Sequence, residues 1–168
     1  LRSLWLRPQS VTVLVGPNGV GKTNLYRALG LLQAAAAGRF ARAIAHEGGM
    51  PSVLWAGKRH KGPVRLRLKV TFEEYQFELA CGLPEFADTR PNTIFCLDPI
   101  IKEEGVHLRV GSKWVSLANR TKAIAEVRDD EGDWVLFSRQ IPKHESMLSE
   151  LREPHRYPQL WLLWQQLH

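Results

Sequence analysis

The sequence predicts an α/β fold with α+β character, in which a strand–loop–helix unit is joined to an antiparallel β-meander. Three observations support this prediction. A β-branched, apolar run at residues 11–15 leads into a glycine-rich turn and then into a helical pattern. From residue 64 the apolar residues alternate with polar ones, which is typical of half-buried strands. A helical pattern returns after Pro142.

The first unit begins with Val-Thr-Val-Leu-Val at residues 11–15, a composition typical of a strand buried on both faces. A helix is predicted from Gly21 to the glycine at position 38. Its apolar positions fall on one face, and four alanines extend it: Leu25, Ala28, Leu29, Leu32 and residues 34–37. A second, short helix is predicted over residues 39–46, stopped by Gly48-Gly49 and Pro51.

The alternating segment predicts a hairpin of two strands, residues 64–72 and 75–81, joined near Glu73-Glu74. Its outer face places a basic strand, with Arg65, Arg67 and Lys69, beside an acidic one. Cross-strand ion pairing explains these cations, and we favour it over a nucleic-acid contact.

Further strands are predicted along the meander, with a hairpin turn at residues 129–133. They are residues 93–97, 105–110, 113–117, 123–128 and 134–139. The C-terminal part carries a short apolar stripe, Met147, Leu148 and Leu151, and a Trp/Leu-rich helix over residues 160–167.

Composition limits the class of protein. The chain has 168 residues with 44% hydrophobic residues, enough for one domain with a core, and a net charge of +6 that permits a polyanionic partner. No apolar run reaches the roughly 20 residues of a membrane span, so we expect no membrane partner. There is no signal-peptide pattern, and the two cysteines, Cys81 and Cys96, lack metal-ligand spacing. We therefore expect a cytoplasmic protein.

The glycine-rich turn at residues 16–23 reads Gly-Pro-Asn-Gly-Val-Gly-Lys-Thr, which matches the P-loop (Walker A) template. Three glycines allow the backbone N–H groups to turn toward a phosphate chain. Lys22 can reach the terminal phosphates, and the Thr23 hydroxyl can ligate Mg²⁺. The predicted site comprises Gly16, Pro17, Asn18, Gly19, Val20, Gly21, Lys22, Thr23 and Asn24, with ATP and Mg²⁺ as cofactors. A plain turn that binds nothing would need neither Lys22 nor Thr23.

Residues 16–25, with their Pro-Asn pair and the Asn-Leu that follows Thr23, resemble the P-loop of ABC-type ATPase heads of the RecF/SMC group. Residues 1–4 resemble the end of the strand that precedes this loop. Residues 47–57, 145–149 and 156–158 resemble segments of predicted AAA-type ATPases within that group.

The resemblance implies ATP hydrolysis between two heads, with a first lobe that combines the P-loop core with an antiparallel sheet. It also implies a glutamine, the Q-loop, that contacts Mg²⁺ and the attacking water. Gln140 is the candidate by position, for a catalytic and a metal-binding role. An exposed glutamine without a role is the alternative.

The departures from the family pattern concern the catalytic half. Residues 93–98 come nearest to a Walker B strand, but Pro99 stands where the catalytic Glu should be, and an ordinary meander strand is the favoured interpretation. No signature motif is present, and His144 and His155 are interpreted as solvated. We therefore expect residues 1–168 to be one partial, truncated P-loop ATPase domain. Its parts are residues 1–57 with the P-loop, the meander at 64–139, and a helical segment at 142–168.

The expected function is ATP binding, and in the full-length protein ATP hydrolysis by a homodimer of heads, with little turnover by this chain alone. Three other functional hypotheses stay open. They are a complete small P-loop kinase, a nucleic-acid-binding module that uses the basic loop at residues 58–61, and a scaffold with non-catalytic nucleotide binding. DNA is a possible partner, and no residue selects a cellular pathway.

Overall fold

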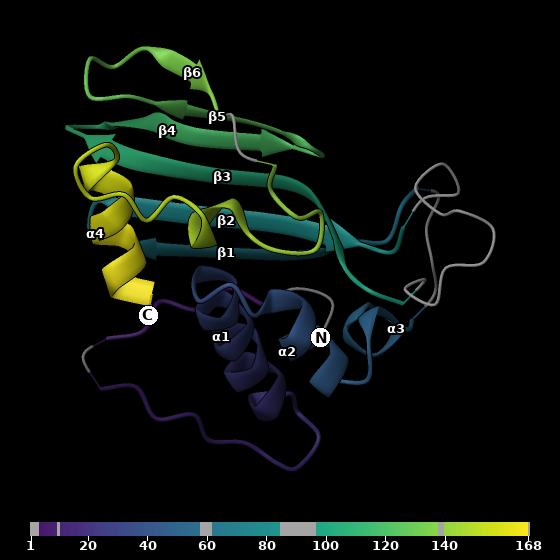
Figure 1. The fold of residues 1–168 in the computed structure, drawn as a ribbon. Coiled ribbons are helices and arrows are strands. Elements are labelled where there is room, and N and C mark those ends of the chain that lie inside the picture. The colour runs from purple at the N-terminus through teal and green to yellow at the C-terminus, as the bar shows by residue number, and fades with distance from the viewer. Residues whose placement is uncertain (1–3, 10, 58–61, 85–96, 138–139, 168) are drawn as a thin grey trace.

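One antiparallel sheet and a set of helices packed beside it make up the structure (Figure 1), which is a computed structural model. It describes residues 4–9, 11–57, 62–84, 97–137 and 140–167. The opening residues 1–3, the basic loop 58–61 and most of the strand predicted at residues 93–97 lie outside this part of the chain.

The sheet has six strands, and each pairs with the next along the chain, so their order in space is their order in sequence. The strands are β1 Leu66–Phe72, β2 Tyr75–Gly82, β3 Ile100–Val110, β4 Lys113–Thr121, β5 Ile124–Arg128 and β6 Trp134–Leu136. All pairings are antiparallel, which confirms the predicted meander. Its hairpin turn at residues 129–133 also forms, with the amide of Asp129 donating to the carbonyl of Asp133 at 3.0 Å.

The alternation of the sequence decides which face of the sheet is buried. In β1, Leu68 is buried while Arg67 and Lys69 are exposed, and β5 follows the same period. The chain reverses between β1 and β2 at Glu73, which has a positive φ of 36°. The predicted hairpin is therefore confirmed, and in its register Phe72 faces Tyr75.

The helices are α1 Lys22–Ala36, α2 Phe40–His46, α3 Met50–Val53, the 3-10 helix η2 Met147–Ser149 and α4 Pro158–Leu167. The first two and the last were predicted from sequence. Left-handed glycines end α1 and α2, since Gly38 has φ 69° and Gly48 and Gly49 have φ 91° and 83°. These conformations explain why the helical pattern stops at glycines.

The core is formed by the inner face of the sheet and the C-terminal half of α1, together with α2, η2 and α4. Its largest apolar members are fully buried: Phe40, Ile44, Met50, Phe77, Ile101, Met147, Leu148, Leu151 and Leu163. The predicted apolar face of α1 is only partly right. Leu31 and Leu32 are buried, but Leu29 is 51% exposed, because the N-terminal half of the helix extends beyond the core.

The strand predicted at residues 11–15 is wrong for this structure. These residues form no strand, and Val11, Val13 and Val15 are 82%, 78% and 91% exposed. A β-strand needs a hydrogen-bonded neighbour, and within the described residues all six strands pair with one another instead. The apolar run is therefore exposed and unpaired.

Replacement of Phe77 by alanine should lower the free energy of unfolding by about 3–5 kcal/mol, because this side chain is fully buried in β2 and the sheet cannot close the cavity. Urea denaturation measures the change. Val13→Ala is the control and should change the same quantity by less than about 0.5 kcal/mol. A large loss for Val13→Ala would show that residues 11–15 are packed in solution.

Candidate functional site

The loop at residues 16–21 has a backbone that requires its glycines. Gly19 and Gly21 have φ of 84° and 104°, in the left-handed region that side chains disfavour. A Cβ added to Gly16 would lie 3.1 Å from Cγ1 of Val20, so the loop is also tight at its start. The amide of Val20 donates to the carbonyl of Pro17 at 3.4 Å, which closes a turn inside the loop.

Helix α1 begins directly after this loop, with Gly21 as its N-cap and no side chain capping it. The first turn of a helix leaves its amides without intrahelical acceptors, here those of Lys22 and Thr23. No acidic residue lies in this turn to occupy them. The free amides and the positive end of the helix dipole favour an anion at this point.

Lys22 lies back across the loop. Its ammonium group donates to the carbonyl of Gly16, and to that of Pro17 at 2.8 Å. The same ammonium group is within reach of any anion that the loop amides bind, since both belong to one short segment. The loop thus places a cation beside a row of free N–H groups, which fits a phosphate chain.

Thr23 and Asn24 are exposed at the start of α1. The Thr23 hydroxyl offers one oxygen ligand, which suits Mg²⁺, because this ion takes most of its remaining ligands from phosphates and water. Within the described residues, no group of three His, Cys, Asp or Glu side chains could hold a metal by itself. The donor set therefore fits a metal that arrives with a polyphosphate.

Gln140 is exposed and follows β6. Figure 1 shows the segment after β6 beside the sheet, whereas the loop lies at the end of α1 that points away from the sheet. The structure therefore does not bring Gln140 to the loop. Its Q-loop role stays a prediction.

The sequence offers three other titratable candidates, Asp98, His144 and His155. Asp98, the residue nearest to a Walker B acid, sits in the turn before β3. His144 and His155 are exposed, in agreement with the solvated interpretation.

The basic outer face of the hairpin is paired across strands, but only Lys69 pairs within the hairpin as predicted. Arg65 and Arg67 both bind Glu103 of β3, the latter at 3.1 Å, and Lys69 lies 3.4 Å from Glu78 of β2. The Arg65 contact, with the others, holds the pKa of Glu103 below its usual value. These cations are therefore neutralised by carboxylates of β2 and β3.

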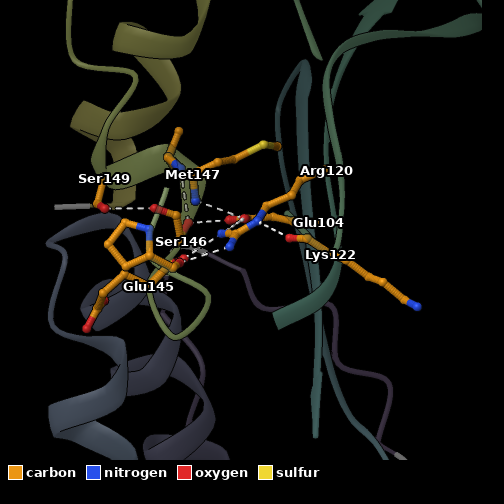
Figure 2. Close-up of polar contacts among 9 residues, drawn as sticks. Glu104, Arg120, Lys122, Glu145, Ser146, Met147 and Ser149 are labelled. Atoms are coloured by element: carbon orange, nitrogen blue, oxygen red, sulfur yellow. Dashed lines mark hydrogen bonds and ion pairs between the residues drawn. The ribbon is translucent and has the colours of Figure 1, made fainter. Parts of the chain in front are cut away.

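A second polar cluster, which the sequence did not reveal, joins the sheet to the C-terminal segment (Figure 2). The carboxylate of Glu104 in β3 accepts from the hydroxyl of Ser146, and from the amide of Met147 at 2.9 Å. Arg120 in β4 lies 3.7 Å from Glu104, and both side chains are fully buried. We call this cluster the polar joint.

Arg120 supplies hydrogen-bond donors to the polar joint from β4. Its guanidinium donates to three carbonyls, those of Lys122 at 2.9 Å, Glu145 at 2.6 Å and Pro142 at 2.9 Å. Burial lowers the pKa of Arg120, against the effect of Glu104. Burial also raises the pKa of Glu104 to about 7, against the donors from Ser146 and Met147 and the charge of Arg120.

One signal in the sequence could have found the polar joint. Glu104 is in phase with the inward-facing Val106 and Arg120 is in phase with Ala118. The predicted strand began only at residue 105, and it therefore left Glu104 out.

The geometry of the loop and helix α1 favours an anion at the start of the helix, and a comparison with protein families points to a class of protein. Residues 11–92 match the model of a family described as AAA domain, putative AbiEii toxin, Type IV TA system. The match spans the loop, α1 to α3 and the first hairpin, and it supports a P-loop AAA-type ATPase domain. Searches of curated proteins and of solved structures found no match.

In the part of the chain that the structure describes, no helix is long and apolar enough to cross a membrane.

The stability of the chain should depend on pH through Glu104. Because its pKa is about 7 in the folded chain and near 4.5 when unfolded, the folded state holds this proton more tightly. The contribution is present below about pH 4.5 and is lost as the pH rises to about 7, by about 3 kcal/mol. Urea denaturation of the wild type and of Glu104→Gln at pH 5 and pH 8 measures it, and the gap between them should shrink at pH 8.

Glu103→Gln is the matched control from the same strand. Its carboxylate is exposed and has a lowered pKa, so its effect should not change between pH 5 and pH 8. A gap between wild type and Glu104→Gln that widens with pH would instead mean that Arg120 keeps Glu104 ionised.

Proposed function

We propose that residues 16–24 bind the phosphate chain of ATP, and that the chain is the P-loop lobe of an ABC-type ATPase head of the RecF/SMC-like group. The observation that carries the proposal is the loop itself. Left-handed glycines, free helix amides and the Lys22 ammonium converge on one exposed segment. The family match over residues 11–92 supports the nucleotide-binding ATPase class.

On this proposal each residue of the loop has a definite role. Lys22 exchanges the carbonyls of Gly16 and Pro17 for phosphate oxygens, while the amides at the start of α1 hold the chain in place. Thr23 supplies a hydroxyl ligand to Mg²⁺, which neutralises charge that develops during phosphoryl transfer. Gln140 is the proposed Q-loop residue.

The exposed apolar run supports the assignment as one lobe. Val11, Val13 and Val15 are exposed and lie directly before the loop, where a P-loop protein has a buried strand. Such a run needs neighbouring strands to cover its two faces. We propose that a second lobe supplies them in the full-length protein, and that two such heads form a homodimer with ATP between them.

The six-stranded antiparallel sheet favours this lobe over a complete small kinase, in which strands and helices alternate throughout. The ion pairs of Arg65, Arg67 and Lys69 offer no support to DNA binding by the sheet.

Replacement of Lys22 by alanine should weaken ATP binding by roughly 10- to 150-fold, because the variant loses a charge-assisted contact to the phosphates. Isothermal titration calorimetry with ATP and Mg²⁺ measures the dissociation constant. Lys69→Ala removes a cation from the sheet and is the control, for which no change is expected. Equal affinities for wild type and Lys22→Ala would refute the phosphate role of the loop.

The chain alone should bind ATP without measurable turnover, because no acidic residue lies in the first turn of α1 and the segment after β6 lies away from the loop in Figure 1. Phosphate release by the purified chain tests this. Turnover that Lys22→Ala abolishes would contradict the expectation and point to an acid such as Asp98. Wild-type binding without turnover is the expected result.

A further inference from the structure

Residues 142–152, which we call the strap, connect the sheet to the far end of the helix that begins at the P-loop. On the sheet side the polar joint holds them, since Glu104 binds Ser146 and Met147 while Arg120 binds the carbonyls of Pro142 and Glu145. The amide of Ile101 adds a further bond to the carbonyl of Lys143 at 2.9 Å.

On the helix side the strap holds the junction between α1 and α2. The Glu145 carboxylate accepts from the amides of Phe40 at 2.8 Å and Ala41 at 3.2 Å, which are free donors at the start of α2. Glu145 therefore contacts both sides. Its carbonyl accepts from Arg120 of the sheet, while its side chain caps α2.

Two more contacts complete this attachment. The guanidinium of Arg152 donates to the carbonyl of Ala36 at 3.4 Å, and Trp164 of α4 donates to the same carbonyl at 2.9 Å. A Cβ at Gly38 would lie 3.2 Å from Cβ of Ser149, so the α1–α2 turn packs closely on the strap. The junction is held by specific contacts on all sides.

The other end of α1 is held by fewer contacts, among them the ion pair of Arg27 with Glu47 at 3.0 Å. Tyr26 and Leu29 are 65% and 51% exposed, whereas Ala35 and Ala36 are fully buried. A helix of 15 residues is about 22 Å long, so a small rotation at its fixed end becomes a displacement of ångströms at the loop. The position of the loop relative to the sheet therefore depends on the strap.

We propose that the strap couples the nucleotide site to the sheet, with Glu145 as the positioning residue that joins the two. This inference rests on the proposed function, because it requires ATP at the loop. Binding that restrains α1 is transmitted to the α1–α2 junction, and through Glu145 to the polar joint.

Amide hydrogen exchange by NMR tests the coupling, with and without ATP and Mg²⁺, in the purified chain. The amides of Gly21 and Lys22 report on the loop, and those of Phe40, Ala41 and Met147 report on the strap contacts. In the wild type both groups should exchange at least about threefold more slowly with ATP. Protection of the loop amides without any change at the strap amides would overturn the coupling.

Glu145→Gln separates coupling from stability. It replaces one carboxylate oxygen by an amide group at the start of α2, and the loop amides should keep their protection while the effect of ATP on Met147 is lost. Glu150→Gln is the matched control, since among the described residues its carboxylate makes no hydrogen bond or ion pair, and the full response should remain. An undiminished response of Met147 in Glu145→Gln would also overturn the proposal.

Two further outcomes have a definite meaning. If Glu145→Gln does not fold, Trp164→Phe replaces it, because this change removes the bond to Ala36 while it keeps an aromatic ring, and it should weaken the response at Phe40. If the loop amides of the wild type show no protection with ATP, the proposed function fails, and the coupling to nucleotide fails with it.

Discussion

The arrangement of the two layers depends on the polar joint between Glu104 and Arg120. A buried ion pair loses its hydration, and this loss is offset only where hydrogen bonds satisfy the remaining donors and acceptors. Here the carboxylate accepts from Ser146 and Met147, and the guanidinium donates to three carbonyls. Because these bonds are directional, they fix one register of the strap on the sheet, which apolar packing alone would specify less strictly.

Burial decreases along α1 with distance from the polar joint. Its C-terminal residues are enclosed by α2, η2 and α4, while its N-terminal turns and the loop are open to solvent. The reason for this decrease is that the strap contacts α1 at its junction with α2. The part of the molecule best suited to bind an anion is thus the part least restrained by the rest of the fold.

The sequence predicted those features whose physical cause is local. Alternation of apolar residues over 64–81 predicted the hairpin and its inward face, and the three closely spaced glycines, Lys22 and Thr23 predicted the loop. It failed where the cause lies far along the chain. Residues 11–15 have the composition of a strand, but composition does not provide a pairing partner. The burial of Glu104 depends on Arg120 and on residues around 146, which no local pattern connects.

The same distinction separates binding from catalysis at the candidate site. The loop at residues 16–21 is made of contiguous residues. Its left-handed glycines and free amides therefore form even though the side chains of Val11, Val13 and Val15 are exposed. Phosphoryl transfer in addition needs groups that reach the phosphates from other elements. The segment after β6 lies beside the sheet, whereas the loop lies at the end of α1 that points away from the sheet. Binding by this chain therefore depends on local geometry, whereas turnover depends on how α1 is placed against elements distant in sequence.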